Sequence, residues 1–204
     1  SSDLMHGEVK MRSEGLRTRD AHLLEWLDKL TTSTIHVVSR PEPFPRLSLA
    51  RRAGHRLPSN WILESPQPFA LPNLRNRREW WVKSTRYFPL ISPNARALAV
   101  WNVIGGAHVL DQVASDVPIW FDLLDDWQIH PLLQPIRRET EHAYSRLFDR
   151  AQLVTANSEG TLELARRFGR SDALLIPNGV DVERFRPAAV SPTADRKSTR
   201  LNSS

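Results

Sequence analysis

The segment from Gln152 to Pro187 constrains the fold more than any other part of the chain. It begins with a short apolar run that stops at Asn157-Ser158, and Ser158 is a favourable N-cap for a helix. Apolar residues then recur at near-helical spacing as far as Gly169, a residue type that ends many helices in the left-handed conformation. A second apolar strand, expected to be buried, follows at 173–176. A strand, a capped helix and a second strand form a βαβ unit, which requires a parallel sheet and a right-handed crossover.

Two loops of this unit follow the carboxyl ends of its strands. The first contains Asn157 and Ser158, and the second contains Asn178, Gly179 and Asp181. Ligands of open parallel sheets bind at this edge. We therefore expect both loops to lie at a ligand-binding site.

The rest of the chain predicts further alternation of strands and helices. We expect strands near 35–39, 97–103 and 117–122, and helices near 19–29, 107–114 and 135–148, the helix at 107–114 preceded by a Gly105-Gly106 turn. The fold class is therefore α/β, a Rossmann-like parallel sheet flanked by helices. Residues 1–15 have the polar composition of a loop after a first strand, so that strand is expected to be largely missing. The segment 41–93 holds most of the 15 prolines, and within it a helix is expected at 76–87 alone.

Composition narrows the classes of partner. Forty per cent hydrophobic and 25% charged residues are typical of a soluble globular protein, and no apolar run approaches the roughly 20 residues that span a bilayer. The absence of cysteine excludes disulfides, thiolate nucleophiles and cysteine-type zinc sites. The net charge of +5 attracts anions, but no nucleic-acid-binding motif accompanies it, so nucleic acid is not an expected partner. Arginines interleaved with Trp61, Trp80 and Trp81 suit contact with an anionic membrane; an arginine-rich surface over buried tryptophans is the alternative.

The densest group of reactive side chains follows the predicted strand 117–122. It consists of Asp122, Asp125, Asp126, Trp127 and His130. These residues could bind a divalent metal, form an acid/base pair, or hold a sugar whose apolar face packs on the tryptophan. Alternatively, the first two aspartates cap turns and the tryptophan fills the core.

The two loops of the βαβ unit also carry a family resemblance. The pair Asn157-Ser158, followed by IPNGVDVERFRP at 176–187, resembles the end of the N-terminal domain of a retaining glycosyltransferase with two Rossmann domains, of the GT-B architecture and similar to family 4. The segment FDLLDDWQIHP at 121–131 resembles a D-x-x-D-D-W segment on the acceptor side of the cleft in some bacterial enzymes of this architecture. That likeness favours acceptor recognition over metal binding, since the architecture generally works without a metal.

The resemblance implies transfer of a hexosyl group from a nucleotide sugar to a glycan or lipid-linked acceptor, in polysaccharide or cell-envelope biosynthesis. The nucleotide sugar is a co-substrate, and no metal or other cofactor is expected. The catalytic residues implied are His130 and Asp126, and the acceptor-binding residues are Asp122, Asp125, Trp127, Gly105 and Gly106. The residues expected to face the donor diphosphate are Gly7, Arg12, Arg17, Asn157, Ser158, Asn178, Gly179 and Asp181.

The same resemblance sets the expected domain boundaries. Residues 1–187 form the acceptor domain with a truncated first strand, and 188–204 contain the start of a linker and a non-native tail. The last ten residues, 195–204, resemble a translated sequencing adapter. In the family the residues that hold the nucleotide sugar lie in a second domain, so these 204 residues alone are expected to be inactive. The expected location is the cytoplasm, with peripheral contact at the inner face of the plasma membrane.

Two other classes of function remain open from the residues. A metal-dependent hydrolase would use Asp122, Asp125, Asp126 and His130, and would need no second domain. A non-catalytic Rossmann-like module would bind a glycan or a membrane without consuming nucleotide sugar. The ordered pair of loops favours the transferase, because neither rival requires it.

Overall fold

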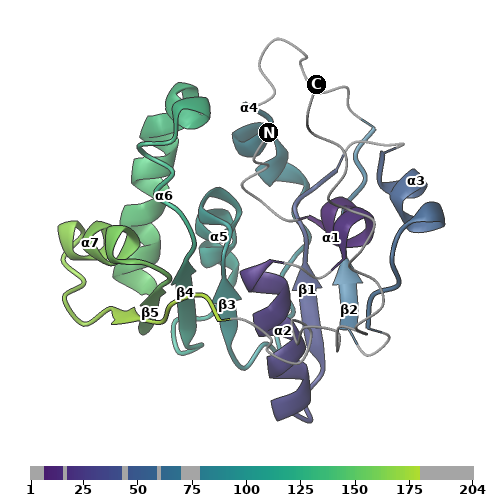
Figure 1. Ribbon diagram of the computed structural model, residues 1–204, viewed down its shortest axis with the longest axis horizontal. Coiled ribbons are helices and arrows are strands. Elements are labelled where there is room, and N and C mark those ends of the chain that lie inside the picture. The colour runs from purple at the N-terminus through teal and green to yellow at the C-terminus, as the bar shows by residue number, and fades with distance from the viewer. Residues whose placement is uncertain (1–6, 16–17, 43–45, 59–60, 70–78, 180–204) are drawn as a thin grey trace, which may run out of the picture.

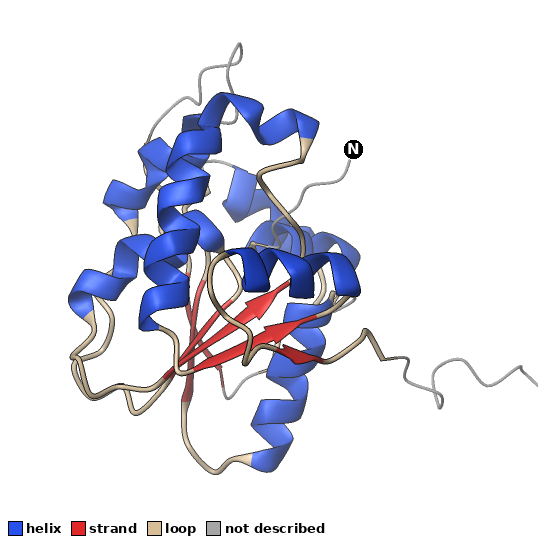
Figure 2. Ribbon diagram, turned by 90° about the vertical axis from the view of Figure 1, so that its left-hand side faces the viewer, coloured by secondary structure: helices blue, strands red, loops and turns tan. Residues whose placement is uncertain are grey.

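The computed structural model describes residues 7–15, 18–42, 46–58, 61–69 and 79–179. Within these ranges every strand pairing is parallel, and helices lie on both sides of the strands (Figures 1 and 2). The predicted α/β class is therefore confirmed. The strands form two sheets, one with the order β1-β2 and one with the order β3-β4-β5-β6, whereas the sequence predicted a single sheet.

The elements in chain order alternate as the sequence predicts over most of their length. They are α1 Glu8–Glu14, α2 Arg19–Leu30, β1 Ile35–Val38, α3 Arg46–Ala53, β2 Trp61–Glu64, α4 Glu79–Lys83, the 3-10 helix η1 Ser84–Tyr87, β3 Leu98–Val100, α5 Val103–Val109, η2 Leu110–Gln112, β4 Ile119–Leu123, η3 Pro131–Ile136, α6 Arg137–Arg150, β5 Leu153–Ala156, α7 Glu159–Arg167 and β6 Leu174–Leu175.

The βαβ unit β5–α7–β6 forms where the sequence predicts it. The Ser158 hydroxyl accepts a hydrogen bond from the Thr161 backbone N–H, and the Thr161 hydroxyl accepts one from the Ser158 backbone N–H, which completes a capping box. Gly169 ends the helix with a φ of +84°. The expected burial of the second strand is wrong: Leu174 is 52% exposed, because β6 is the edge strand and has a neighbour on one side alone among the described residues.

Two groups of buried apolar side chains form the core. The larger packs β3, β4 and β5 against α5, α6 and α7, and includes Phe121 and Phe148, whose ring centroids are 5.4 Å apart. The smaller packs Leu24 of α2 against Val37 of β1 and Trp61 of β2. Each sheet thus has its own core, and α2 covers the smaller one.

The proline-rich segment contains more regular structure than predicted. Helix α3 and strand β2 form in addition to the helix expected at 76–87. That helix begins at Glu79 within the described residues and tightens into η1 from Ser84 onward. Each element fits between prolines, and the four residues of β2 pair with β1, a partner that short local patterns do not reveal.

Gly105 and Gly106 lie inside α5, so the expected glycine turn is wrong. The helix begins at Val103, four residues before the expected start at 107, because the Asn102 side chain caps it by accepting a hydrogen bond from the Gly105 N–H at 2.8 Å. A Cβ on Gly106 would lie 2.2 Å from Val100 Cγ1, and one on Gly105 would lie 2.5 Å from Phe88 Cζ. Both glycines are buried and allow the helix to approach its neighbours closely.

Replacing Gly106 by alanine is expected to lower the free energy of unfolding by about 2 kcal/mol, because the new methyl group overlaps the Val100 side chain. Gly160→Ala in α7 is the matched control, since its Cβ meets nothing closer than 3.9 Å. The control is expected to be neutral or to stabilise by up to about 1 kcal/mol. Urea unfolding of both variants measures the difference, and equal stabilities would contradict close packing at Gly106.

Candidate functional site

The carboxyl ends of β3, β4 and β5 meet at one buried carboxylate, that of Asp122. Arg19, the first residue of α2, donates to both of its oxygens, Nε to Oδ2 and Nη2 to Oδ1, each at 2.9 Å. The Trp101 indole N–H and the Thr155 hydroxyl donate to the same carboxylate. Asp122 was predicted to bind the acceptor. Its side chain is 0% exposed, and its carboxylate pairs with Arg19 inside the protein.

Arg19 also reaches the loop after β6. Its Nη1 lies 3.3 Å from the Pro177 carbonyl oxygen and 3.3 Å from Asn178 Oδ1. One guanidinium therefore ties the start of α2 to the end of β4 and to the predicted ligand loop. The sequence interpretation chose Arg12 and Arg17 and missed this arginine. A signal was present, because a cation in the first turn of a helix is disfavoured by the helix dipole and calls for a carboxylate partner.

Asn157 and Ser158 lie at the same edge, at the start of α7. Asn157 Nδ2 donates to the Leu124 carbonyl oxygen at 2.8 Å, and its Oδ1 accepts from the Thr161 hydroxyl at 3.0 Å. Ser158 is exposed although its hydroxyl caps the helix. Asn178 and Gly179 are also exposed, so the two predicted loops do present surface at this edge. Asp181 lies outside the described residues.

Trp127 is a core residue. It is 3% exposed, and its ring meets that of Trp81 edge-on at a centroid separation of 5.7 Å. The backbone around it is fixed by Tyr144, whose hydroxyl donates to the Asp125 carbonyl oxygen at 2.9 Å and accepts from the Trp127 N–H at 3.2 Å. Burial raises the pKa of Tyr144 far above its ordinary value, so this hydroxyl stays protonated. The expectation that Trp127 packs on a sugar ring is therefore wrong.

Asp125, Asp126 and His130 remain near the surface of the same loop. Asp125 is exposed and His130 is half-buried. Asp126 Oδ2 accepts from Arg167 of α7 at 2.8 Å, and its Oδ1 accepts from the Gln128 N–H at 2.9 Å. These two residues therefore hold the Asp126 carboxylate in a fixed position next to α7.

Gly7 and Arg12 belong to a different cluster, around α1. A Cβ on Gly7 would lie 3.2 Å from Ser39 Oγ, beside the end of β1. Arg12 Nε donates to the buried Glu8 carboxylate at 2.6 Å, and Arg51 of α3 donates to both Glu8 oxygens at 2.8 Å. Arg12 is therefore paired within α1, and its Nη1 also donates to the His55 carbonyl oxygen after α3 at 3.3 Å, while Arg51 joins α3 to α1. Arg17 lies outside the described residues.

The Glu8 cluster makes stability depend on acid pH. Burial alone would raise the pKa of Glu8, but the hydrogen bonds from Arg51 and Arg12 outweigh it and lower the pKa from 4.5 to about 2. Because the folded state has the lower pKa, the carboxylate stabilises the fold above about pH 4.5, and this contribution disappears as the pH falls toward 2.

Glu8→Gln is expected to lower the free energy of unfolding by about 2 to 3 kcal/mol at pH 7, and to flatten its decline between pH 4.5 and 2. Chemical unfolding at a series of pH values measures both effects. Glu79→Gln is the control, because that carboxylate pairs with Lys83 at the surface. If the unfolding free energies of the wild type and of Glu8→Gln changed in parallel with pH, the cluster would not stabilise the charged form of Glu8.

The expected catalytic loop forms no metal centre. Across the described ranges, no three His, Cys, Asp or Glu side chains gather as ligands for one ion. Asp122 points into its pair with Arg19 and Asp126 into its pair with Arg167, so these two carboxylates do not converge.

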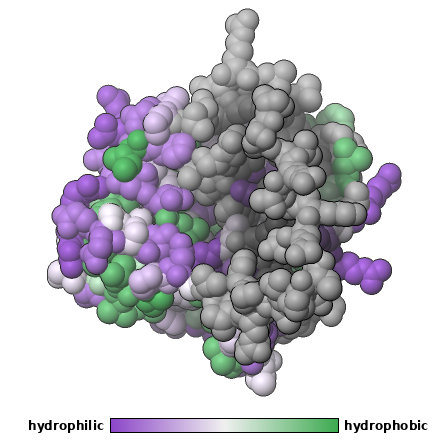
Figure 3. Space-filling model, viewed as in Figure 1, coloured by the Kyte–Doolittle hydropathy of each residue, from purple (hydrophilic) through white to green (hydrophobic). Residues whose placement is uncertain are grey.

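The described surface carries charged and polar groups with scattered apolar patches, as the left half of Figure 3 shows over α6 and α7. Among the described helices, none combines the length and the apolar character that crossing a bilayer requires. Trp61 is buried, while Trp80 and Trp81 are half-buried. Trp80 donates to the Pro41 carbonyl oxygen, and the Arg40 guanidinium lies 4.4 Å from the Trp81 ring centroid. Of these three tryptophans, Trp81 is therefore covered by an arginine, as the alternative predicted.

The comparisons with known proteins give one match. The family model described as Glycosyltransferase Family 4 matches residues 15–184. The match includes the Asp122–Arg19 pair, the loop 124–131 and both ligand loops, and it begins after Gly7 and Arg12. No curated protein and no solved structure matches the chain.

Proposed function

This chain belongs to glycosyltransferase family 4, and from that premise we propose that it is the acceptor-binding half of a retaining hexosyltransferase. Its reaction moves a sugar from a nucleotide-sugar donor to a glycan or lipid-linked acceptor. The observation that carries the proposal is the family match over residues 15–184, which covers the whole carboxyl edge of the larger sheet. We propose polysaccharide or cell-envelope assembly as its setting, with a peripheral approach to membrane-borne acceptors.

The donor side of the proposed site lies on α7 and the loop after β6. The backbone N–H groups at the start of α7 and the exposed Ser158, Asn178 and Gly179 lie at adjacent strand ends. A helix N-terminus favours the negative charge of a diphosphate. In a retaining transfer the leaving diphosphate develops charge as the sugar departs, so donors placed here stabilise the transition state.

The acceptor side lies on the loop after β4. We assign Asp125 and His130 the hydrogen bonds to acceptor hydroxyls, since Asp125 is exposed and His130 is half-buried. The Asp126 carboxylate accepts a hydrogen bond from Arg167. We assign His130 and Asp126 the role of orienting the attacking hydroxyl and receiving its proton. No metal and no cofactor beyond the nucleotide sugar enters this proposal. The residues that bind the nucleotide belong to a donor domain that follows residue 187, so residues 1–187 alone are inactive.

The test is an assay of nucleoside diphosphate release by the protein carrying the sequence that follows residue 187 at its natural locus, against a panel of nucleotide sugars. Release is expected to require an added acceptor, and to fall at least about 100-fold in Asp126→Asn and in His130→Ala. Arg167→Ala is the matched control, because it removes the partner of Asp126 and keeps the carboxylate. This control is expected to retain activity within about tenfold.

Other outcomes identify the rival functions. If the protein hydrolysed a substrate in a metal-dependent way without nucleotide sugar, its function would be that of a hydrolase and not of a transferase. Glycan binding with no release from any nucleotide sugar would leave a binding module. If Asp126→Asn and Arg167→Ala lost activity equally, the role of Asp126 would be structural and not catalytic.

A further inference from the structure

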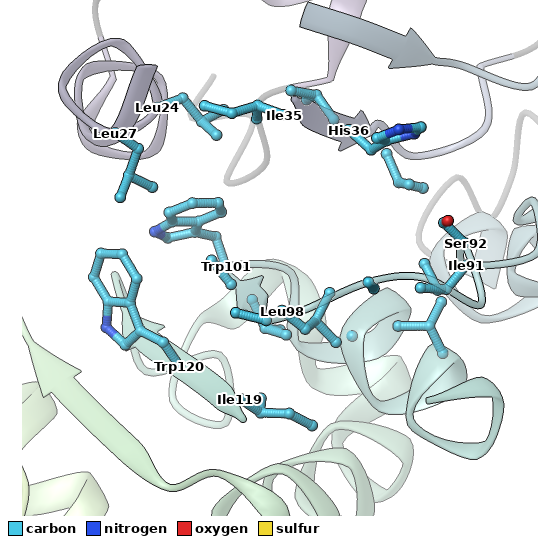
Figure 4. Close-up of a pocket in the computed structure, with 18 of the residues that line it drawn as sticks. Leu24, Leu27, Ile35, His36, Ile91, Ser92, Leu98, Trp101, Ile119 and Trp120 are labelled. Atoms are coloured by element: carbon cyan, nitrogen blue, oxygen red, sulfur yellow. The ribbon is translucent and has the colours of Figure 1, made fainter. Parts of the chain in front are cut away.

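The Asp122 carboxylate holds the Arg19 guanidinium in one orientation. Arg19 donates to both carboxylate oxygens, and further donors fix the carboxylate itself. The Trp101 indole N–H donates to Oδ2, while the Thr155 hydroxyl donates to Oδ1 and accepts from the Trp120 indole N–H at 2.8 Å. The two indole rings meet edge-on with their centroids 5.8 Å apart, and Figure 4 shows them adjacent. Because all of these side chains are buried or half-buried, the direction of the guanidinium is set from inside the protein.

This orientation aims the third guanidinium nitrogen at the loop after β6. Nε and Nη2 are used by the carboxylate, and Nη1 lies 3.3 Å from the Pro177 carbonyl oxygen and 3.3 Å from Asn178 Oδ1. The Ile176 N–H donates to the Ala156 carbonyl oxygen at 2.8 Å, and the loop leaves the sheet directly after this bond. Arg19 therefore holds the loop at the point where it separates from β5.

The contact with Arg19 decides which end of the Asn178 side chain faces outward. An arginine has N–H donors and no acceptor, so the amide must turn its carbonyl oxygen toward the guanidinium. The NH₂ group of a planar amide diverges from that oxygen, and it therefore points away from Arg19. Because Asn178 is exposed, the NH₂ group presents its N–H donors at the surface of the site.

The outward NH₂ group shares an edge of the sheet with the start of α7. Ala156 of β5 pairs with Leu175 of β6, and neighbouring strands lie about 4.8 Å apart, so the loops after them begin as neighbours. The first of these loops leads to the N-terminus of α7, where backbone N–H groups favour negative charge. The positive charge of Arg19 is paired with Asp122, so Arg19 acts on a ligand through Asn178 rather than through its own charge.

We propose that Arg19 is a positioning residue of the donor side, which fixes the Asn178 amide so that its NH₂ group donates to the diphosphate of the nucleotide sugar. This inference rests on the proposed function, because that function supplies the diphosphate. A hydrogen bond to a charged group is stronger than one between neutral groups, and its loss lowers affinity about tenfold.

Asn178→Asp tests the outward donor. The aspartate keeps one oxygen for Arg19 and replaces the NH₂ group by a second oxygen that repels a diphosphate. In the protein used for the nucleoside diphosphate release assay, the KM for the nucleotide sugar is expected to rise at least about tenfold. The acceptor KM is expected to stay within about twofold, and the melting temperature within about 2 °C. An unchanged nucleotide-sugar KM would overturn the proposal.

Arg19→Lys tests the positioning. Lysine keeps a positive charge for Asp122 but lacks the planar fork that reaches Asn178 as well. The nucleotide-sugar KM is expected to rise at least about fivefold, whereas a merely structural role would lower kcat through the active fraction and leave this KM unchanged. In an Asn178→Ala background, Arg19→Lys is expected to change the same KM by less than about twofold, since Arg19 acts through the amide. Equal effects in the two backgrounds would contradict this coupling.

Arg170→Lys is the matched control. Arg170 also pairs with an aspartate through two nitrogens and donates to backbone carbonyl oxygens. Its side chain is 15% exposed, compared with 11% for Arg19, and it follows the C-terminal end of α7. The control is expected to leave both KM values within about twofold. A rise as large as that in Arg19→Lys would mean that the loss of any such arginine has this effect, and the positioning role would fail.

Binding of inorganic pyrophosphate separates this inference from the proposed function, because it needs no turnover. Isothermal titration calorimetry is expected to show binding at least about fivefold weaker in Asn178→Asp and in Arg19→Lys than in the wild type. If this weakening occurred in a protein that releases no nucleoside diphosphate, the proposed function would fail and the positioned amide would stand as an anion site. If release occurred and both variants bound pyrophosphate like the wild type, the positioning role alone would fail.

Discussion

Asp122→Ala is expected to lower the free energy of unfolding by about 3 to 5 kcal/mol. The substitution leaves the Arg19 guanidinium, which is 11% exposed, without its bidentate carboxylate, and also leaves the Trp101 indole and Thr155 hydroxyl without their acceptor. An unpaired buried charge costs much more than the intact pair contributes, because the charge loses both water and its partner. Urea unfolding measures the loss.

Two further variants separate the buried pair from an ordinary surface ion pair. Asp111→Ala breaks the pair with Arg146, in which Asp111 is 76% exposed, and is expected to cost less than about 1 kcal/mol. The double variant Arg19→Met, Asp122→Leu is expected to recover part of the loss, since it leaves no charge behind. A cost for Asp122→Ala as small as that for Asp111→Ala would mean that water reaches the carboxylate.

Trp127→Ala is expected to cost about 3 to 5 kcal/mol, because it removes a large buried side chain and leaves a cavity against Trp81. Trp127→Phe keeps part of the packing and is expected to cost about half as much. Thermal or urea unfolding provides the measurement.

The control is Trp26→Ala. Trp26 is 58% exposed, so this substitution is expected to change the free energy of unfolding by less than about 1 kcal/mol. If Trp127 instead packed on an acceptor sugar, Trp127→Ala would leave the unfolding free energy unchanged and weaken acceptor binding. That outcome would contradict the core position and restore the role first expected for this residue.

For the candidate site, the sequence predicted the position of the loops better than the use of their side chains. Asn157, Ser158, Asn178 and Gly179 do lie at adjacent strand ends, as the βαβ pattern requires. Their roles toward the donor stay predictions, as do those of Asp125, Asp126 and His130. Asp122 is the last residue of the predicted strand, but its burial depends on Arg19, which lies 103 residues away in the sequence.

The sequence by itself determined the β5–α7–β6 unit, because its signals are local. Ser158 caps the helix through Thr161, three residues away, and Gly169 ends it through its own backbone conformation. Such signals act within one turn of chain, so they are visible without knowledge of the fold. The family resemblance rests on the same segment, which is why it too was found from the sequence.

The tertiary structure alone decided burial and pairing. Gly105 and Gly106 are typical of a turn by residue type, yet they lie in α5 because Val100 and Phe88 require close approach. Trp127 is core because Trp81, distant in the sequence, packs against it. The separation of β1 from β3 is likewise a property of the assembled sheets. Each of these features depends on which segments meet in space, and residues far apart in the chain supply the contacts that fix them.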